Sequence, residues 1–333
     1  MNTQRRRFLA LAGAAFSAGA LSAAMGRDRA ERSSVPLDVT DTFDAVAFAN
    51  ARVFATTEFG RVAYVERGRG RAALFLHGFP LNSFQWRGAI ERLAAHRRCI
   101  APDFLGLGAS IPASGQDLGP EAQADMIVAL LDDLGIDDAD VIASDSGGAV
   151  AQLLVVRHRA RVRTLLLTNC DTEIESPPAA MRPVIELSKR GEFADRWLAP
   201  WLADPVLARS PQGIGGMCYS NPTHPTDAAL SMYLSPLLES AQRKGWLHEY
   251  AVALSKNVLA GIGPQLAASG VPARVVWGMD DTIFSAAGAA YLERTIARAH
   301  GVRRLDNARL FWPEERPDIV AAQARILWES AHA

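Results

Sequence analysis

Apolar and polar residues follow one another in short, regular blocks from about residue 51 onward. Residues 52–56 and 61–65 alternate with a period of two around a glycine turn, which predicts two half-buried strands. Residues 72–76 are apolar throughout, as expected of a strand that is buried on both faces. The pattern predicts further strands at 99–101, 139–143 and 164–168. It predicts helices at 83–95, 123–134 and 147–159. This alternation predicts a mostly parallel sheet with helices on both faces.

The alternation stops after Asp171, and up to about Gly263 only helical stretches with Pro and Gly between them are recognisable. Beyond this segment a strand, a helix, a strand and a final helix are expected at 273–277, 286–299, 302–305 and from Glu315. A helical insertion after the sixth strand could cover the carboxyl edge of the sheet. We therefore expect a core of residues 51–170 and 264–333 and a helical cap of residues 171–263.

The N-terminal segment has a different character. Three consecutive arginines, Arg5 to Arg7, precede a run of small apolar residues from Ala10 to Ala24, and the first acidic residue is Asp28. This arrangement is typical of an export signal, and its arginines resemble the twin-arginine type. We expect residues 1–24 to be this signal, residues 25–50 to be a tether, and the protein to be periplasmic or secreted. An uncleaved membrane anchor is the alternative, although the run is short for a membrane span.

Composition and charge narrow the classes of function. The chain is 49% hydrophobic and 21% charged with a formal net charge of -1, and it has no basic stripe of the kind that binds nucleic acid. Its three cysteines, Cys99, Cys170 and Cys218, are too far apart to indicate a disulfide framework. The seven histidines show no spacing of the kind that a metal site needs. No feature indicates the oligomeric state.

The most informative segment joins the strand at 139–143 to the helix that follows it. Ala143 and Gly147 are the small residues of a nucleophile elbow, in which a strand turns sharply into a helix, and Asp145 lies at the nucleophile position between them. Ser146 follows at a helix N-terminus, where free N–H groups favour negative charge. Ser146 and Ser144 are competing nucleophiles, and an aspartate that only caps the helix is the structural alternative.

With this elbow the chain resembles the α/β-hydrolase superfamily, and within it the enzymes with an aspartate nucleophile: haloalkane dehalogenases, fluoroacetate dehalogenases and epoxide hydrolases. The resemblance extends from about residue 50 to the C-terminus. His-Gly-Phe-Pro at 77–80 matches the loop that supplies an oxyanion N–H group, here from Phe79 beside that of Ser146. Residues 102–110 match the structural D-x-x-G-x-G-x-S turn of the family.

The resemblance also implies a catalytic acid. Trp-Gly-Met-Asp-Asp at 277–281 matches the strand end that carries it, which assigns this role to Asp281. Asp280 is the less favoured choice, and Asp171 occupies the alternative acid position that some relatives use. In such enzymes the aspartate attacks carbon, displaces a halide or opens an epoxide, and forms an ester that a histidine-activated water then hydrolyses. They do this chemistry with side chains alone, so the resemblance implies neither a metal nor an organic cofactor.

The chain departs from the family where this histidine is expected. The stretch should end in a pattern like P-E-E-x-P, and seven residues before Pro317 lies Leu310. No histidine lies between Gly301 and Ala331. His224 and His248 of the cap are the remaining candidates that could reach the site.

The residues that would bind substrate are also atypical. Haloalkane dehalogenases usually place Trp after the nucleophile and often Asn in the oxyanion loop, where this chain has Ser146 and Phe79. Epoxide hydrolases use pairs of cap tyrosines, for which Tyr219, Tyr233 and Tyr250 are candidates and Tyr233 is favoured. Trp312 and Leu310 are further possible substrate contacts.

Two interpretations follow. The first is a hydrolase that acts on a small apolar substrate, an alkyl halide or an epoxide, through Asp145 with support from Asp281. The second is a non-hydrolytic protein of the same fold, which binds a ligand or carries out chemistry without a triad. Leu310 favours the second interpretation, whereas the elbow, the acid and the oxyanion loop favour the first.

Overall fold

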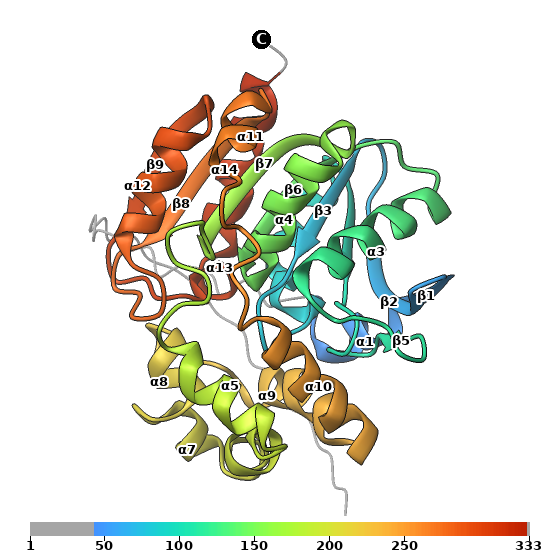
Figure 1. Cartoon of the computed structure of the whole chain (residues 1–333), viewed down its shortest axis with the longest axis vertical. Coiled ribbons are helices and arrows are strands. Elements are labelled where there is room, and N and C mark those ends of the chain that lie inside the picture. The colour runs from blue at the N-terminus through green and yellow to red at the C-terminus, as the bar shows by residue number, and fades with distance from the viewer. Residues whose placement is uncertain (1–42, 332–333) are drawn as a thin grey trace, which may run out of the picture. The chain divides into compact units, whose positions relative to one another are not determined.

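The computed structural model of the protein describes residues 43–331, which form one nine-stranded sheet with helices on both faces and a helical cap (Figure 1). The strands are β1 (Arg52–Thr57), β2 (Gly60–Arg67), β3 (Ala72–Leu76), β4 (Arg98–Pro102), β5 (Ile111–Pro112), β6 (Ala139–Asp145), β7 (Val162–Cys170), β8 (Pro272–Gly278) and β9 (Arg298–Leu305). The helices of the core are α1 (Ala45–Asn50), η1 (Ser83–Trp86), α2 (Arg87–Leu93), α3 (Pro120–Asp133), α4 (Ser146–Arg157), η2 (Arg159–Arg161), α11 (Gly263–Ala268), α12 (Ala286–Thr295), α13 (Trp312–Glu315) and α14 (Pro317–Ser330).

The order of the strands is β1-β2-β4-β3-β6-β7-β8-β9, and β5 pairs with β2. All neighbours from β4 to β9 are parallel, and the pairings of β2 with β1, β4 and β5 are antiparallel. The predicted mostly parallel sheet is therefore confirmed. The short strand β5 was not expected, and because of it the cap follows the seventh strand instead of the sixth.

The continuous apolar runs form the centre of the sheet. Every residue of β3 and of β6 is buried, because helices cover both faces there. Helix α2 packs on α14, and α3 packs on α4. Figure 1 shows α3 and α4 in front of the sheet. The carboxyl ends of β6, β7 and β8 lie next to one another at one edge of this sheet, which brings Asp145, Cys170 and Gly278 into one region.

Between β7 and β8 the chain forms the cap, which occupies the lower part of Figure 1. Its helices are α5 (Met181–Lys189), η3 (Ala194–Leu198), α6 (Ala199–Ala203), α7 (Pro205–Arg209), α8 (Ile214–Cys218), α9 (Asp227–Leu238) and α10 (Ala241–Ala253). Helix α10 packs against α5 and α9, and α9 packs against α6. All of these helices fall within the range predicted for the cap.

The predicted tether of residues 25–50 is wrong at its C-terminal end. Phe43 and Phe48 are buried, and the ring of Phe48 lies 5.1 Å from that of Phe84. Helix α1 begins after Asp44, whose carboxylate accepts the Ala47 N–H group at 2.8 Å. This segment therefore belongs to the folded unit. The predicted export signal and the rest of the tether lie outside the described residues.

Candidate active site

The strand β6 meets the helix α4 at Asp145, in a tight turn. Asp145 has φ 55° and ψ −133°, and it is one of two non-glycine residues with positive φ in the described part of the chain. A Cβ atom at Gly147 would lie 2.5 Å from the His77 carbonyl oxygen, and one at Gly148 would lie 2.3 Å from the Cys170 Cβ. The crossing of strand and helix therefore requires glycine at both positions. Backbone strain of the kind seen at Asp145 is concentrated at functional sites in proteins.

The carboxylate of Asp145 is held by backbone donors. Its Oδ1 accepts the N–H group of Phe79 at 3.1 Å and the N–H group of Ser146. These are the two groups that the sequence predicts as oxyanion donors, and the structure brings both to Asp145. Burial raises the pKa of Asp145 to about 6, and the hydrogen bonds from Ser146 and Phe79 oppose this rise. Above that pH the side chain is a carboxylate whose Oδ2 remains for chemistry.

Asp145 lines a cavity of about 170 Å³ whose walls come from both the core and the cap. Among the lining residues, only Asp145 and Cys218 carry an ionisable group. The apolar walls are Phe79, Pro80, Ala180, Met181, Pro183, Val184, Phe193, Trp197, Trp201, Ile214, Met217, Ile283, Leu310 and Phe311. A carboxylate in such surroundings suits a small, uncharged and largely apolar ligand.

A second cavity, of about 20 Å³, also reaches Asp145. Ser146 and Asp171 line it, together with apolar residues of the cap and of the loop after β8. Asp171 is 6% exposed, and its pKa is well above the usual range, first because of burial and second because of the Asp145 charge. Of residues 43–331, those that line the two cavities include no Lys, Arg or His.

Asp281 follows β8 and is fixed by two hydrogen bonds. Its Oδ2 accepts Asn169 Nδ2 at 2.7 Å, and its Oδ1 accepts the Ile283 N–H group at 2.8 Å. Burial raises the pKa of Asp281 to about 7 against the effect of these bonds, and the charge of Asp145 adds to the rise. Asp281 does not line either cavity beside Asp145.

Asn169 is a residue of this region that was missed in the sequence. Its Oδ1 accepts the Gly278 N–H group at 2.7 Å and Trp312 Nε1 at 3.1 Å. Trp312, a predicted substrate contact, is therefore buried against Asn169 and does not line the cavities. The available signal was a polar side chain near the carboxyl end of a buried strand that pairs with the strand ending at Asp145.

No histidine of the described residues lines either cavity. His77 Nε2 accepts the Phe104 N–H group at 3.0 Å, and its Nδ1 lies 2.9 Å from the Gly78 carbonyl oxygen, so both ring nitrogens are engaged. His248 Nε2 accepts the Ala194 N–H group at 3.1 Å, and His224 stacks on a tyrosine ring of the cap. Leu310, at the expected position of the catalytic histidine, is 2% exposed and forms part of the apolar wall.

The favoured cap tyrosine is not at the site. The Tyr233 hydroxyl donates to Glu314 Oε2 at 2.9 Å, and Glu314 also accepts Tyr219 Oη at 2.6 Å and pairs with Arg87 at 2.9 Å. Tyr233 lines neither cavity. Tyr250 also lines neither cavity, but it is nearer to Asp145, since its ring stacks on Phe79 at 5.7 Å with an angle of 7° between the planes. The structure thus separates Tyr233 from Asp145 and brings Tyr250 to the oxyanion loop.

Replacement of Tyr233 by Phe is expected to lower the free energy of unfolding by about 1.5 kcal/mol, because one hydrogen bond to a buried carboxylate is lost. The measurement is urea unfolding at pH 7.5, with Tyr219→Phe as the matched variant at the same carboxylate. An unchanged midpoint in both variants would show that these hydrogen bonds do not stabilise the fold.

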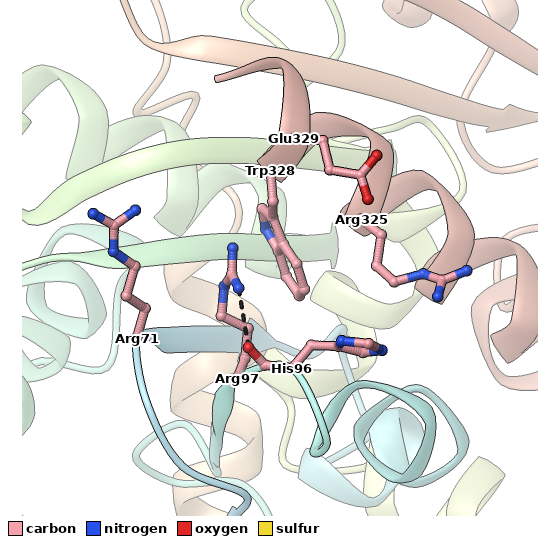
Figure 2. Close-up of a pocket in the computed structure, with 6 residues that line it drawn as sticks. All are labelled: Arg71, His96, Arg97, Arg325, Trp328 and Glu329. Atoms are coloured by element: carbon pink, nitrogen blue, oxygen red, sulfur yellow. Dashed lines mark hydrogen bonds between the residues drawn. The ribbon is translucent and has the colours of Figure 1, made fainter. Parts of the chain in front are cut away.

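A basic hollow lies at the opposite edge of the sheet, near the amino ends of β3 and β4. Figure 2 shows the residues that line it, Arg71, His96, Arg97, Arg325, Trp328 and Glu329. The Arg97 guanidinium lies 4.1 Å from the centre of the Trp328 ring, and its Nε pairs with Asp140 at 2.8 Å. Among the described residues that line this hollow, no carboxylate or hydroxyl group is bound by backbone N–H groups in the way that Asp145 is. The carboxyl edge is therefore the candidate active site.

Within residues 43–331, no cluster of three or more His, Cys, Asp or Glu side chains is arranged to hold a metal ion. None of the helices in this range has both the length and the apolar character that a membrane crossing needs. The three cysteines are buried and free.

Known proteins are similar to this chain in sequence and in fold. Residues 73–311 match the alpha/beta hydrolase fold family. The chain is 27% identical over 278 residues to haloalkane dehalogenase 2 of Mycobacterium tuberculosis, which covers 79% of this chain and 90% of that protein. It is 37% identical over 108 residues to a soluble epoxide hydrolase of Corynebacterium sp., which covers 32% of this chain and 37% of that protein.

Among solved structures, a thermophilic esterase from Thermogutta terrifontis superposes with a TM-score of 0.67 at 25% identity, covering 85% of this chain and 99% of that one. The match of the family to more than two thirds of the sequence agrees with the parallel sheet, the elbow and the cap. The chain belongs to the α/β-hydrolase fold family and is related, at low identity, to haloalkane dehalogenases and epoxide hydrolases.

Proposed function

We propose that the protein is a hydrolase that uses Asp145 as a carboxylate nucleophile on a small apolar substrate of the alkyl halide or epoxide type. The observation that carries this proposal is the setting of Asp145. Its Oδ1 is bound by the N–H groups of Phe79 and Ser146, while the side chain lines an apolar cavity of about 170 Å³. These two hydrogen bonds hold Oδ1 in place, and they thereby also fix the position of Oδ2.

The chemistry follows from the nucleophile. Attack of Asp145 Oδ2 on a saturated carbon forms a C–O bond and expels a halide or opens an epoxide ring, which leaves an ester on the enzyme. When water later attacks the ester carbonyl, the N–H groups of Phe79 and Ser146 are placed to stabilise the oxyanion. The names of the haloalkane dehalogenase and epoxide hydrolase relatives agree with this class of substrate.

The second candidate is a protein that binds an apolar ligand, or transforms it without a triad. It is favoured by one observation, the apolar side chain of Leu310 in the cavity wall where the resemblance expects a histidine. We also propose, from the sequence of residues 1–24, that the protein acts in the periplasm or outside the cell.

Incubation with a short 1-bromoalkane at pH 7.5 is expected to increase the intact mass by one alkyl group, because bromide leaves without needing a proton. Asp145→Asn should show no increase, since an amide is a poor nucleophile. Peptide mapping would locate the adduct on Asp145. If the wild-type protein binds the bromoalkane yet neither gains mass nor releases bromide, the nucleophile proposal fails and the binding-protein candidate stands.

A further inference from the structure

The small cavity beside Asp145 contains a carboxyl group, that of Asp171, which the chemistry described above does not use. Asp145, Ser146 and Asp171 all line it, and its volume of about 20 Å³ is enough for one water molecule or one substrate oxygen. Its remaining walls are Pro177, Pro178, Met181, Leu254, Ile283 and Phe284. The main chain at Asp171 is anchored, since its carbonyl oxygen accepts Gln152 Nε2 at 2.8 Å.

Two buried hydroxyl groups in or next to this compartment make no hydrogen bond of ordinary geometry within the protein. They belong to Ser146, which lines the cavity, and to Tyr250, whose hydroxyl lies beside that of Ser146. A buried hydroxyl group without a hydrogen bond is unfavourable. Such groups therefore point to a polar ligand atom that completes them, and an oxygen atom fits both the volume and the chemistry.

The two carboxyl groups of the compartment differ in protonation. Burial and the charge of Asp145 hold the pKa of Asp171 well above the usual range, whereas backbone hydrogen bonds keep that of Asp145 near 6. A hydrogen bond from Ser176 opposes the rise at Asp171 without cancelling it. At neutral pH the compartment therefore holds one carboxylate and one neutral carboxylic acid, a pairing that divides nucleophile and acid roles in enzymes.

We propose that Asp171 is a further catalytic residue, which protonates the oxygen released when Asp145 opens an epoxide and then serves as the base for ester hydrolysis. The proposal rests on the proposed function of Asp145. No histidine of the described part of the chain lines either cavity, so the proton transfers are assigned to the carboxyl group of Asp171, on the segment after β7.

The steps balance in atoms and charge. Asp145 Oδ2 forms a bond to an epoxide carbon, the ring C–O bond breaks, and the proton of Asp171 moves to the released oxygen, which leaves a hydroxyalkyl ester and an Asp171 carboxylate. Asp171 then accepts a proton from water as the water oxygen attacks the ester carbonyl. Collapse of the tetrahedral intermediate releases the diol oxygen, which takes that proton. Asp145 is left as the acid and returns its proton to Asp171, so the net reaction is epoxide plus water to diol.

The mechanism selects a class of substrate. The oxygen released from an epoxide needs a proton and takes it from Asp171. Asp171 is then a carboxylate and can act as the base that the second step requires. A halide leaves as a stable anion, so Asp171 stays protonated and the ester persists. We therefore infer that small apolar epoxides are turned over, whereas alkyl bromides stop at the ester.

The test compares two substrates of equal chain length, a 1,2-epoxyalkane and a 1-bromoalkane, in the wild type and in Asp171→Asn. At pH 7.5 we expect the variant to consume the epoxide at least about 100-fold more slowly, which is the ordinary scale of general acid catalysis. Alkylation by the bromide should change by less than about threefold, because that step needs no proton. Asn is isosteric with a neutral Asp, and the retained bromide reaction reports that the variant is folded.

A matched control is Glu173→Gln, an acid of the same segment that accepts the N–H groups of Gly261 and Gly263 and lines neither cavity; both rates should be unchanged. Equal loss of both reactions in Asp171→Asn would assign Asp171 a structural role and overturn the proposal, as would no loss in either. A wild type that is alkylated by the bromide but leaves the epoxide intact would overturn the role of Asp171 while the nucleophile stands. A wild type that reacts with neither substrate would overturn both.

Discussion

Leu310→His is expected to accelerate hydrolysis of the ester formed on Asp145 by at least about 100-fold, the scale of general base catalysis by a positioned imidazole. Leu310 lies in the wall of the cavity that contains Asp145 and is 2% exposed, so an imidazole there would face the ester. The segment of Leu310 runs beside the loop after β8, where the Asp280 N–H group donates to the Ala308 carbonyl oxygen at 3.0 Å. Asp281 follows directly and could orient the new imidazole.

The measurement starts from the ester made with a 1-bromoalkane, since this ester should persist in the wild type. Loss of the added mass and release of the alcohol are then followed with time at pH 7.5. Leu310→Gln is the matched control, because it is polar and of similar size but cannot accept a proton. Adding Asp281→Asn to the histidine variant should remove much of the gain. If the ester of Leu310→His is as long-lived as that of Leu310→Gln, position 310 is not the place of the missing base.

Asp145→Asn is expected to stabilise the protein by about 3 kcal/mol at pH 7.5. Asp145 is 8% exposed, and burial raises its folded pKa to about 6 from a usual value of 3.8. When the pKa of a carboxyl group is higher in the folded than in the unfolded protein, its contribution to the free energy of unfolding is fully present below the unfolded pKa. This contribution is lost as the pH rises through the folded pKa. The wild type therefore loses stability between about pH 4 and pH 6, and an asparagine, which does not titrate, avoids that loss.

Chemical denaturation of both proteins at pH 4.5 and pH 7.5 measures this effect. The difference in unfolding free energy between variant and wild type should be about 2 kcal/mol larger at pH 7.5, which is the part of the loss that falls between these two values. Titration of Asp281 is common to both proteins and largely cancels in the comparison. A difference that is equal at the two pH values would mean that Asp145 is not destabilised by burial.

Local sequence was sufficient to predict the turn from strand to helix at Asp145. The apolar run before Asp145, the glycines after it and the helical spacing that follows are neighbours in the chain, and their conformations are set by sterics over a few residues. The same is true of the βα alternation, since each strand and helix carries its own hydrophobic period. These patterns predicted the sheet and its parallel character.

The surroundings of the turn could not be derived in this way. The sequence shows three cap tyrosines, but their order along the chain does not tell which helix faces the oxyanion loop, so Tyr233 was favoured where Tyr250 lies. Trp312 was expected to contact substrate, yet its indole N–H group donates to Asn169, a residue of a strand more than a hundred positions earlier. Contacts over such separations depend on how the cap and core pack.

The sequence by itself determined the α/β-hydrolase core, the place of Asp145 and the absence of a histidine at position 310, because these depend on residue identity and local period. Only the tertiary structure decided that Asp171 shares a small cavity with Asp145 while Asp281 is bound to Asn169 outside it. Burial, and the protonation that follows from it, arise from the summed packing of distant segments, and no local pattern of residues carries that information.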